Sequence, residues 1–352
     1  MSKAGRHRIF RASLLMVAGT VALLMAGVTT AQGAVPKVVP QARPASTISA
    51  RLPAIGAPSK ALCKQAHYKI GYDVWTSSQA FSDIVTNALM ASAKSIGCVT
   101  MLKTIDNENG PVAVGNLKTL VEEGIQGFVD FQILAPFQPA MASELKTAKI
   151  PGVSIIGAPL PGWPGVGANN YTSAYDAGVY LATVAKKRFP GKAVYFLDAA
   201  ETSGGVLIMS RYSGAAAGAK KVLPDVHIVR VVTDGTETTS YSNAVSALST
   251  VPSGAVVITQ GENDEVTGGM FKAIQSRGFA DYLANSYGGD SYGFSQVCAQ
   301  PVHYVGSWYL EPVAWGQDAL TVIMDEINHV KTGSVGIVGE EVTHSTPLLH
   351  CK

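Results

Sequence analysis

The sequence has 352 residues, of which 47% are hydrophobic and 15% are charged, so the chain can bury a sizeable core, in two lobes rather than one. Lys and Arg together number 27 and Asp and Glu 25, and four of the basic residues but no acidic one lie within residues 1–33. Without those residues, 23 basic groups stand against 25 acidic ones, a net charge near −2. This near-neutral balance gives no indication of a nucleic-acid partner.

The N-terminus has the pattern of a secretory signal peptide. Residues 1–11 are basic, residues 12–28 are apolar, and Ala31-Gln32-Gly33 places small residues at the −3 and −1 positions of a cleavage site near Gly33. Polar, proline-rich sequence follows, which favours a cleaved signal over a membrane anchor, and no cysteine near the cleavage site could carry a lipid. We therefore predict a secreted, extracytoplasmic protein whose residues 34–65 form a disordered Pro/Ala-rich leader.

A first series of alternating strands and helices follows the leader. The helix predicted at Phe81–Ile96 has apolar residues at helical spacing and is closed by Gly97. The other predicted helices are 112–123 and 139–148, and the predicted strands are 69–74, 99–105, 127–134 and 152–156. Strand–helix–strand units of this length imply right-handed crossovers and a doubly wound parallel sheet.

A second series begins after the Gly/Pro-rich passage Pro159–Gly167. Its predicted helices are 171–188, 206–222, 241–249, 266–276 and 312–329, and its strands are 192–197, 227–233, 255–259, 282–286 and 303–308. Two such α/β series joined by a hinge-like passage predict two lobes with a cleft between them. The carboxyl ends of the strands of both lobes would face that cleft.

The four cysteines are an even number in an oxidising compartment, which favours structural disulfides over free thiols. Three pairings are open. Cys63 and Cys98 each stand just before one of two adjacent strands, which would bring them together at one sheet edge; Cys298 and Cys351 would then tie down the C-terminus. The spacings do not resemble a zinc site.

The stretch Ala255–Gly269 is the most informative of the chain. A short apolar strand leads directly into the polar turn Gln260–Glu265, and a helix follows. Asn263 and Asp264 in this turn can form directional hydrogen bonds with a polar small molecule, as expected at the carboxyl end of a parallel strand. The alternative is that one of them only caps the helix.

Seven motifs in a fixed order resemble one family. They are Lys69-Ile70-Gly71, Glu122–Gly127, Ile150–Val153, Asn169–Tyr171, Arg211 with Gly214, Glu262–Glu265, and Glu311-Pro312 with Gly316-Gln317. Over Lys69–Gly333 the chain thereby resembles the type I periplasmic binding proteins of the ribose-binding class, kin to the effector domain of lac-type repressors. None of the motifs is specific alone; their order along some 265 residues carries the resemblance.

The resemblance implies a monomeric two-lobed clamp with a three-strand hinge and no catalytic residues, cofactor or metal. The clamp closes on one small molecule, a sugar or sugar-like compound, and delivers it to the permease of an ABC transporter. It assigns residues 66–168 and 310–332 to an N-terminal lobe and residues 169–309 and 333–352 to a C-terminal lobe.

The resemblance also gives candidate ligand-binding residues. They are Trp75, Gln79 and Phe81 in the first lobe, Asn170, Arg211 and Asn263 in the second, and less directly Asp290, Trp308 and Glu311. The aromatic side chains offer flat faces that can stack on the C–H face of a sugar ring. The planar guanidinium of Arg211 can donate to two ligand oxygens, and the side-chain amides can form hydrogen bonds with ligand hydroxyl groups. The competing interpretations are core packing for the aromatic residues and a surface position for Arg211.

The chain departs from the family at two ligand positions. Ile155-Ile156-Gly157 stands where sugar binders of this class usually have an Asp-Arg pair, and Gly288 stands where an aspartate is expected, with Asp290 as a shifted substitute. These departures remove charged groups that grip sugar hydroxyls, and Trp163 in the neighbouring loop could fill part of the space. A less polar or aromatic ligand is therefore the alternative to a sugar.

The sequence also bears on three other functions. The histidines are scattered without metal-ligand spacing, and the chain has no Gly-x-Ser-x-Gly elbow or phosphate-binding glycine loop, which disfavours a secreted enzyme. In the related repressors a DNA-binding helix-turn-helix stands at the N-terminus, where this chain has the predicted signal peptide. A transcriptional regulator is therefore excluded. A chemosensory or sensor-kinase binding protein uses the same clamp, and the sequence leaves it open beside transport.

Overall fold

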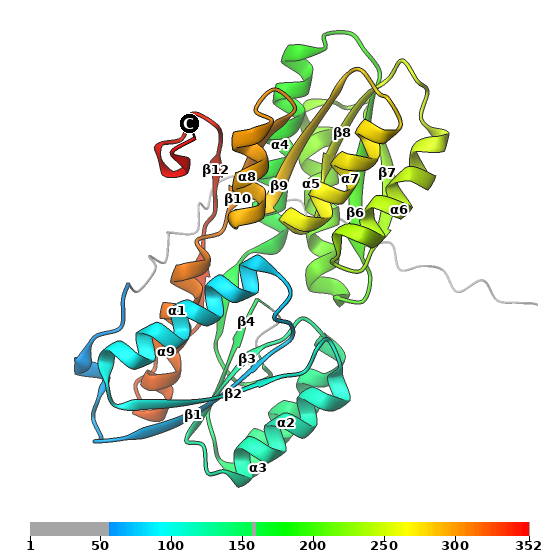
Figure 1. Ribbon diagram of the computed structural model, residues 1–352. Helices are drawn as coiled ribbons and strands as arrows, with labels where there is room; N and C mark the ends of the chain where they lie inside the picture. Colours follow the sequence, from blue (N-terminus) through cyan, green and yellow to red (C-terminus); the bar gives the residue numbers. More distant parts are fainter. Residues whose placement is uncertain (1–55, 157–159, 352) are drawn as a thin grey trace, which may run out of the picture. The chain divides into compact units, whose positions relative to one another are not determined.

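In the computed structural model of the protein, residues 56–156 and 160–351 are described. They form two six-stranded sheets, one for each lobe (Figure 1). The expected signal peptide and most of the expected leader lie outside the described residues. No helix within the described part is long and apolar enough to cross a membrane.

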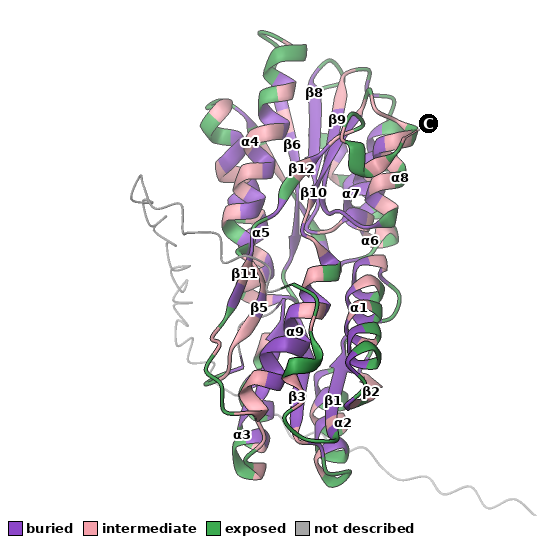
Figure 2. Ribbon diagram, turned by 90° about the vertical axis from the view of Figure 1, so that its left-hand side faces the viewer, coloured by how far each residue is buried: buried purple, intermediate pink, exposed green. Residues whose placement is uncertain are grey.

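The first sheet has the strand order β11-β5-β4-β3-β1-β2, and every neighbouring pair is parallel. Its strands are β1 (Tyr68–Val74), β2 (Val99–Ile105), β3 (Gly127–Phe131), β4 (Gly152–Ile155), β5 (Gly165–Ala168) and β11 (Val335–Ile337). All five residues of β3 are buried, as expected of a parallel strand covered on both faces (Figure 2).

The second sheet repeats this order as β12-β10-β9-β8-β6-β7. Its strands are β6 (Val194–Glu201), β7 (His227–Thr233), β8 (Val256–Gln260), β9 (Tyr282–Gly288), β10 (Tyr304–Tyr309) and β12 (Glu340–Val342). Only the pairing of β12 with β10 is antiparallel among the described strands. In both sheets the first strand of the series lies between the second and the third, so each sheet has a topological switch point.

Helices cover both faces of each sheet, which confirms the two doubly wound lobes. In the first lobe α1 (Ala80–Ile96) packs with α9 (Pro312–Ile327), and α2 (Gly110–Glu122) packs with α3 (Gln138–Ala148) on the other face (Figure 1). In the second lobe α4 (Asn170–Arg188) packs with α5 (Gly205–Val222). The other face carries α6 (Glu237–Ala247), α7 (Asp264–Ser276) and α8 (Ser291–Ala299).

The chain passes between the two sheets three times. The passages run from β5 to α4, from β10 to α9, and from β11 to β12. This is the predicted three-strand hinge. One assignment needs correction: residues 333–352 were placed wholly in the second lobe, whereas β11 pairs with β5 in the first sheet and only the chain after it returns to the second.

The N-terminal boundary also needs correction. The leader was expected to be disordered to residue 65, but Lys60–Leu62 forms the 3₁₀ helix η1 and Cys63 is bonded to Cys98. The Tyr68 hydroxyl accepts the backbone N–H groups of Lys64 and Gln65 and fixes this segment further. Cys298 is bonded to Cys351, so both disulfides have the expected partners.

Glycines allow α4 and α5 to pack backbone against backbone. A Cβ at Gly218 of α5 would lie 2.1 Å from the carbonyl oxygen of Tyr175 in α4, and one at Gly178 of α4 would lie 2.4 Å from that of Ala215. Side chains at these points would force the helices apart. Gly178 and Gly218 are therefore required for the packing of the second lobe.

We expect Gly218→Ala to lower the free energy of unfolding by about 1–3 kcal/mol, because the added methyl group overpacks this contact. Urea denaturation checks this. The matched control is Gly115→Ala in α2, an exposed helical glycine whose added Cβ would meet nothing within 4 Å. That variant is expected to gain up to about 1 kcal/mol from helix propensity. Equal effects of the two substitutions would contradict the packing argument.

Candidate functional site

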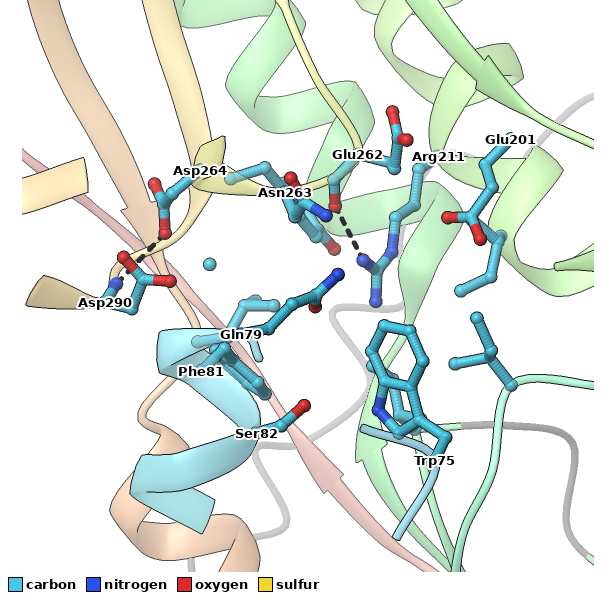
Figure 3. Close-up of a pocket in the computed structure, with 16 residues that line it drawn as sticks. Trp75, Gln79, Phe81, Ser82, Glu201, Arg211, Glu262, Asn263, Asp264 and Asp290 are labelled. Atoms are coloured by element: carbon cyan, nitrogen blue, oxygen red, sulfur yellow. Dashed lines mark hydrogen bonds between the residues drawn. The ribbon is translucent and has the colours of Figure 1, made fainter. Parts of the chain in front are cut away.

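A cavity lies where the carboxyl ends of strands from both sheets meet. Trp75, Ile133 and Ile156 follow β1, β3 and β4, and Glu201 and Asn263 stand at the ends of β6 and β8. The complete lining is Trp75, Gln79, Phe81, Ser82, Ile133, Ile156, Glu201, Ile208, Arg211, Glu262, Asn263, Asp264, Tyr287, Gly288, Asp290 and Leu310 (Figure 3). The empty space between these side chains, including the part that is open to solvent, is about 470 Å³. The topological switch points of the two sheets thus both contribute residues to this cavity.

The first lobe supplies a mainly apolar wall. The Phe81 ring packs edge-on against the buried Trp315, with ring centroids 5.1 Å apart, so α9 fixes its orientation. The indole N–H of Trp75 and the hydroxyl of Ser82 are buried without a hydrogen-bond partner. This wall therefore offers an aromatic surface and two free polar groups to a bound molecule.

Arg211 is the centre of the second lobe's wall. Its Nε donates to Asn170 Oδ1 at 2.8 Å, and its Nη1 donates to the backbone oxygen of Glu262 at 2.7 Å. The guanidinium lies over the ring of Tyr287, 4.9 Å from the centroid, and its Nη2 has no partner. Figure 3 shows the free end of the guanidinium directed toward Trp75. Arg211 is thus held rigidly, with one donor left for a ligand oxygen.

Carboxyl groups make up most of the remaining polar lining. Asp264 is fully engaged, because its Oδ1 accepts Ser307 Oγ at 2.8 Å and its Oδ2 accepts the backbone N–H of Asp290 at 3.0 Å. Asp290 caps α8 by accepting the backbone N–H groups of Tyr292 and Gly293 with Oδ1. Glu262 accepts Thr233 Oγ1 with Oε1. The second oxygens of Asp290 and Glu262 have no partner.

Burial raises the pKa values of these carboxyl groups. The pKa of Glu201 rises to about 8, chiefly through burial and then through the neighbouring Glu262, with Arg211 opposing the shift. The pKa of Asp290 rises to about 9 through burial and the nearby Asp264 and Glu265. Arg211 lowers the pKa of Glu201, whereas Asp264 and Glu265 raise the pKa of Asp290, so the two ends of the cavity differ in electrostatic environment.

We expect the ligand-free protein to lose stability as the pH rises from about 4 to about 9. Carboxyl groups in the unfolded chain have pKa values near 4, whereas Glu201 and Asp290 keep their protons to about pH 8 and 9 in the folded state. The folded protein binds more protons in this window, so the stabilisation present below pH 4 is lost progressively up to pH 9. Urea denaturation at pH 5 and pH 8 measures the loss. Glu201→Gln should make the profile flatter, and an unchanged profile in this variant would contradict the assignment.

Two hydrogen bonds join the lobes beside the cavity. Gln79 Nε2 donates to the backbone oxygen of Gly235 at 3.2 Å, and the backbone N–H of Ala80 donates to Glu265 Oε1 at 3.2 Å. Gln79 and Ala80 stand at the N-terminus of α1 and their partners belong to the second lobe, so these bonds fasten the mouth of the cavity. Opening the clamp has to break both.

The structure brings six of the nine predicted site residues together in the cavity lining: Trp75, Gln79, Phe81, Arg211, Asn263 and Asp290. Asn170 lies behind Arg211 and reaches the cavity only through it. Trp308 is buried in β10, and Glu311 is the N-cap residue of α9 at the hinge, with a φ of 53°. Neither lines the cavity.

Two alternatives from the sequence are resolved. Asn263 is the N-cap of α7, since its Oδ1 accepts the backbone N–H of Val266 at 2.7 Å, and its Nδ2 donates to Gly235 at 2.9 Å. Trp163 does not fill the space left by the missing Asp-Arg pair; it packs against the core beneath α2 and α3. Ile156 lines that part of the cavity, with a φ of 65° that a β-branched residue seldom adopts, and Gly157 lies outside the described residues.

Several lining residues, above all Glu201, are not among the site residues that the sequence predicts. Its strand was predicted to end at Leu197, whereas β6 continues to Glu201. Extending the strand would have placed this carboxyl group at the carboxyl edge of the sheet, where ligands bind. Glu262 was included only as part of a motif. The departures from the family therefore do not leave the cavity without charge, since its carboxyl groups come from the second lobe.

Among the described residues, no group of three or more His, Cys, Asp or Glu side chains is placed to hold a metal ion. The polar lining consists of oriented donors and acceptors with an aromatic wall opposite. Such an arrangement suits noncovalent binding of a small polar molecule.

Solved structures with a similar fold include ABC transporter solute-binding proteins. One is an ABC transporter periplasmic solute-binding protein from Actinobacillus succinogenes 130z with bound D-allose, which is 16% identical and has a TM-score of 0.67 over 79% of this chain and 98% of its own. Another, from Mycobacterium smegmatis with bound glycerol, is 16% identical with a TM-score of 0.71 over 81% and 97%. A third, from Bacillus halodurans C-125 with bound myo-inositol, is 12% identical with a TM-score of 0.67 over 80% and 96%.

These similarities show that the chain has the type I periplasmic binding protein fold. No family model matches the sequence, and no curated protein matches it.

Proposed function

We propose that this protein is an extracytoplasmic solute-binding protein of an ABC importer that captures a sugar or sugar-like molecule in the cavity between its lobes. The observation that carries the proposal is the cavity itself. It is lined from the carboxyl ends of strands in both sheets. Its aromatic wall keeps a free polar atom on Trp75, and the second lobe keeps free polar atoms on Arg211 and Asp290. The similar solved structures have D-allose, glycerol and myo-inositol bound.

Each wall has a part in this function. The rings of Trp75 and Phe81 would cover the C–H face of a sugar ring, and Gln79 lies between the two walls (Figure 3). Arg211 would donate to a ligand oxygen through Nη2, and Asp290 would accept from a ligand donor through Oδ2. Asn263 would serve mainly by holding the turn after β8 in place.

Ligand capture would follow from hinge closure. The three passages between the sheets allow the lobes to rotate, and the bonds from Gln79 and Ala80 to the second lobe would form on closing. The closed form would then dock on the permease and release its ligand unchanged. This role places the mature protein outside the cytoplasm as a monomer without a cofactor.

A thermal-shift screen of the mature protein tests the proposal, because a ligand that binds only the folded state must raise the melting temperature. The screen covers sugars, polyols, nucleosides and small aromatic compounds, each at a concentration well above its expected Kd. A rise with sugars or polyols supports the proposal, and recovery of the compound unchanged distinguishes binding from catalysis. The absence of any rise among sugars and polyols would contradict it.

A less polar or aromatic ligand is the second candidate, favoured by one observation. The first-lobe wall is built from Trp75, Phe81, Ile133 and Ile156, without a charged side chain in the cavity lining. A thermal shift only with aromatic compounds would support this candidate.

A further inference from the structure

The charges that line the cavity are unequal in number. Of the 16 lining residues, four carry carboxyl groups (Glu201, Glu262, Asp264 and Asp290), whereas Arg211 is the single basic residue. No histidine or lysine is among them. A bound molecule therefore meets a lining with more potential negative than positive charge.

The excess is concentrated at the end of the cavity away from Arg211. Asp290 and Arg211 lie at opposite ends, with Gln79 and Phe81 between them (Figure 3). The groups that act on the Asp290 carboxyl are the further carboxyls Asp264 and Glu265, while Arg211 acts on Glu201 and Glu262. The Asp290 end thus gathers three carboxyl groups, those of Asp290, Asp264 and Glu265.

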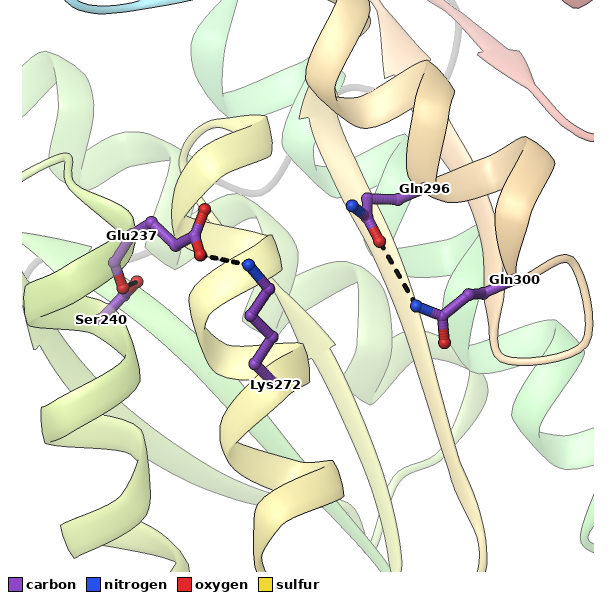
Figure 4. Close-up of polar contacts among 5 residues, drawn as sticks. All are labelled: Glu237, Ser240, Lys272, Gln296 and Gln300. Atoms are coloured by element: carbon purple, nitrogen blue, oxygen red, sulfur yellow. Dashed lines mark hydrogen bonds and ion pairs between the residues drawn. The ribbon is translucent and has the colours of Figure 1, made fainter.

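Ion pairing within the protein does not relieve this excess. The ion pairs of the described residues are Lys192–Asp281 and Lys272–Glu237, and none of these residues lines the cavity. The second pair links α6 and α7 (Figure 4). The carboxyl groups at the Asp290 end therefore have no positive partner.

Asp290 is oriented and has one oxygen free. Its residue is only 1% exposed, and its Oδ1 is fixed by the backbone N–H groups of Tyr292 and Gly293 at 2.8 and 3.0 Å. Its Oδ2 is buried without a hydrogen-bond partner. A buried carboxyl oxygen of this kind is costly to leave alone, and a positively charged donor compensates it most strongly.

We propose that the ligand carries a protonated amine in addition to its hydroxyl groups, as an amino sugar or amino polyol does, and that the ammonium group pairs with Asp290. The Asp290 carboxyl holds its proton at pH 7 in the ligand-free protein and releases it when the ammonium group binds. This inference rests on the proposed function and adds the chemical class of the ligand that the protein would capture. The hydroxyl groups at the other end accept from Arg211 Nη2, and the C–H face of the ligand lies against Trp75 and Phe81. Glu265, whose Oε2 is also buried without a partner, provides a second carboxyl group near Asp290.

Matched ligand pairs test this class. The binding of D-glucosamine, D-galactosamine and 1-amino-1-deoxy-D-sorbitol is compared by calorimetry at pH 7 with that of D-glucose, D-galactose and D-sorbitol. We expect at least one amine to bind roughly 10- to 100-fold more tightly than its neutral partner, the difference that a hydrogen bond to a charged group makes.

Asp290→Asn is the diagnostic variant, because asparagine removes the charge but still caps α8. In this variant the amine should lose its advantage over its neutral partner. Asp281→Asn is the matched control, since it removes the same charge from the Lys192 pair outside the cavity. Circular dichroism and melting temperature verify that both variants fold.

The outcomes separate the two proposals. Equal or tighter binding of the neutral partners would overturn the amine inference and leave the sugar-binding function standing. An amine preference that survives Asp290→Asn would overturn the assignment to this residue. If no compound of either series binds, both the inference and the proposed function fail.

Discussion

Replacing Arg211 by methionine is expected to abolish ligand binding and to lower the free energy of unfolding by about 3 kcal/mol or more, the usual effect of removing one partner from a buried charged network. The substitution leaves Asn170 Oδ1 and the Glu262 backbone oxygen without their donor. It also removes the only cation near Glu201 and Glu262 in the cavity lining. Stability and binding therefore fall together.

The measurement combines urea denaturation with a thermal-shift assay at saturating ligand. Arg230→Met provides the control, because Arg230 is exposed on β7 and lies over the ring of Tyr212 at 5.7 Å. Its removal should change the stability by no more than about 0.5 kcal/mol. If the two variants lose equal stability, Arg211 does not organise the second lobe's wall.

The second large effect is expected from opening the Cys298–Cys351 disulfide with the double substitution to serine. The bond closes a loop of 53 residues between α8 and the C-terminus, and loss of such a cross-link typically costs about 2–4 kcal/mol. Beyond β12, Pro347–Leu349 forms only the short helix η4. The C-terminal residues should therefore separate from α8 when the bond is absent.

Urea denaturation measures the loss, and hydrogen exchange locates it. We expect faster exchange in residues 343–351 and unchanged exchange in the core of the first lobe. The corresponding double alanine variant controls for the buried serine hydroxyls. A protein that keeps its unfolding midpoint without the bond would show that the tail is held by other contacts.

The long periodic elements were predictable because their signals are local. The strand Val99–Ile105 and the strand His227–Thr233 were placed at their observed bounds, and the longer helices within two residues at most ends. The missed elements depend on partners distant in sequence. β5 is Gly-Val-Gly-Ala and pairs with β4 and β11, and β11 is Val-Gly-Ile and pairs with β5, which lies about 170 residues earlier in the chain.

A lining residue was predictable where it directly follows a strand that the sequence reveals. Trp75 and Asn263 were placed in the cleft region because they follow strands, and both line the cavity. Glu201 was missed because β6 is longer than its apolar run, and α8 because nine residues with an internal glycine give little periodicity. The helix-capping role of Asp290 depends on α8, so the sequence could not reveal which of its oxygens is free.

The interleaving of the two lobes along the chain has a consequence for how the protein is made. β1–β5 are synthesised first, yet their sheet lacks α9 and β11 until residue 337 has been added. Trp315, the largest fully buried side chain of α9, packs against Phe81 near the start of the chain. Contacts over such sequence distances form late and slow the folding of the chain. The part that leaves the ribosome first therefore waits, with an uncovered sheet face, for one of the last helices to complete it.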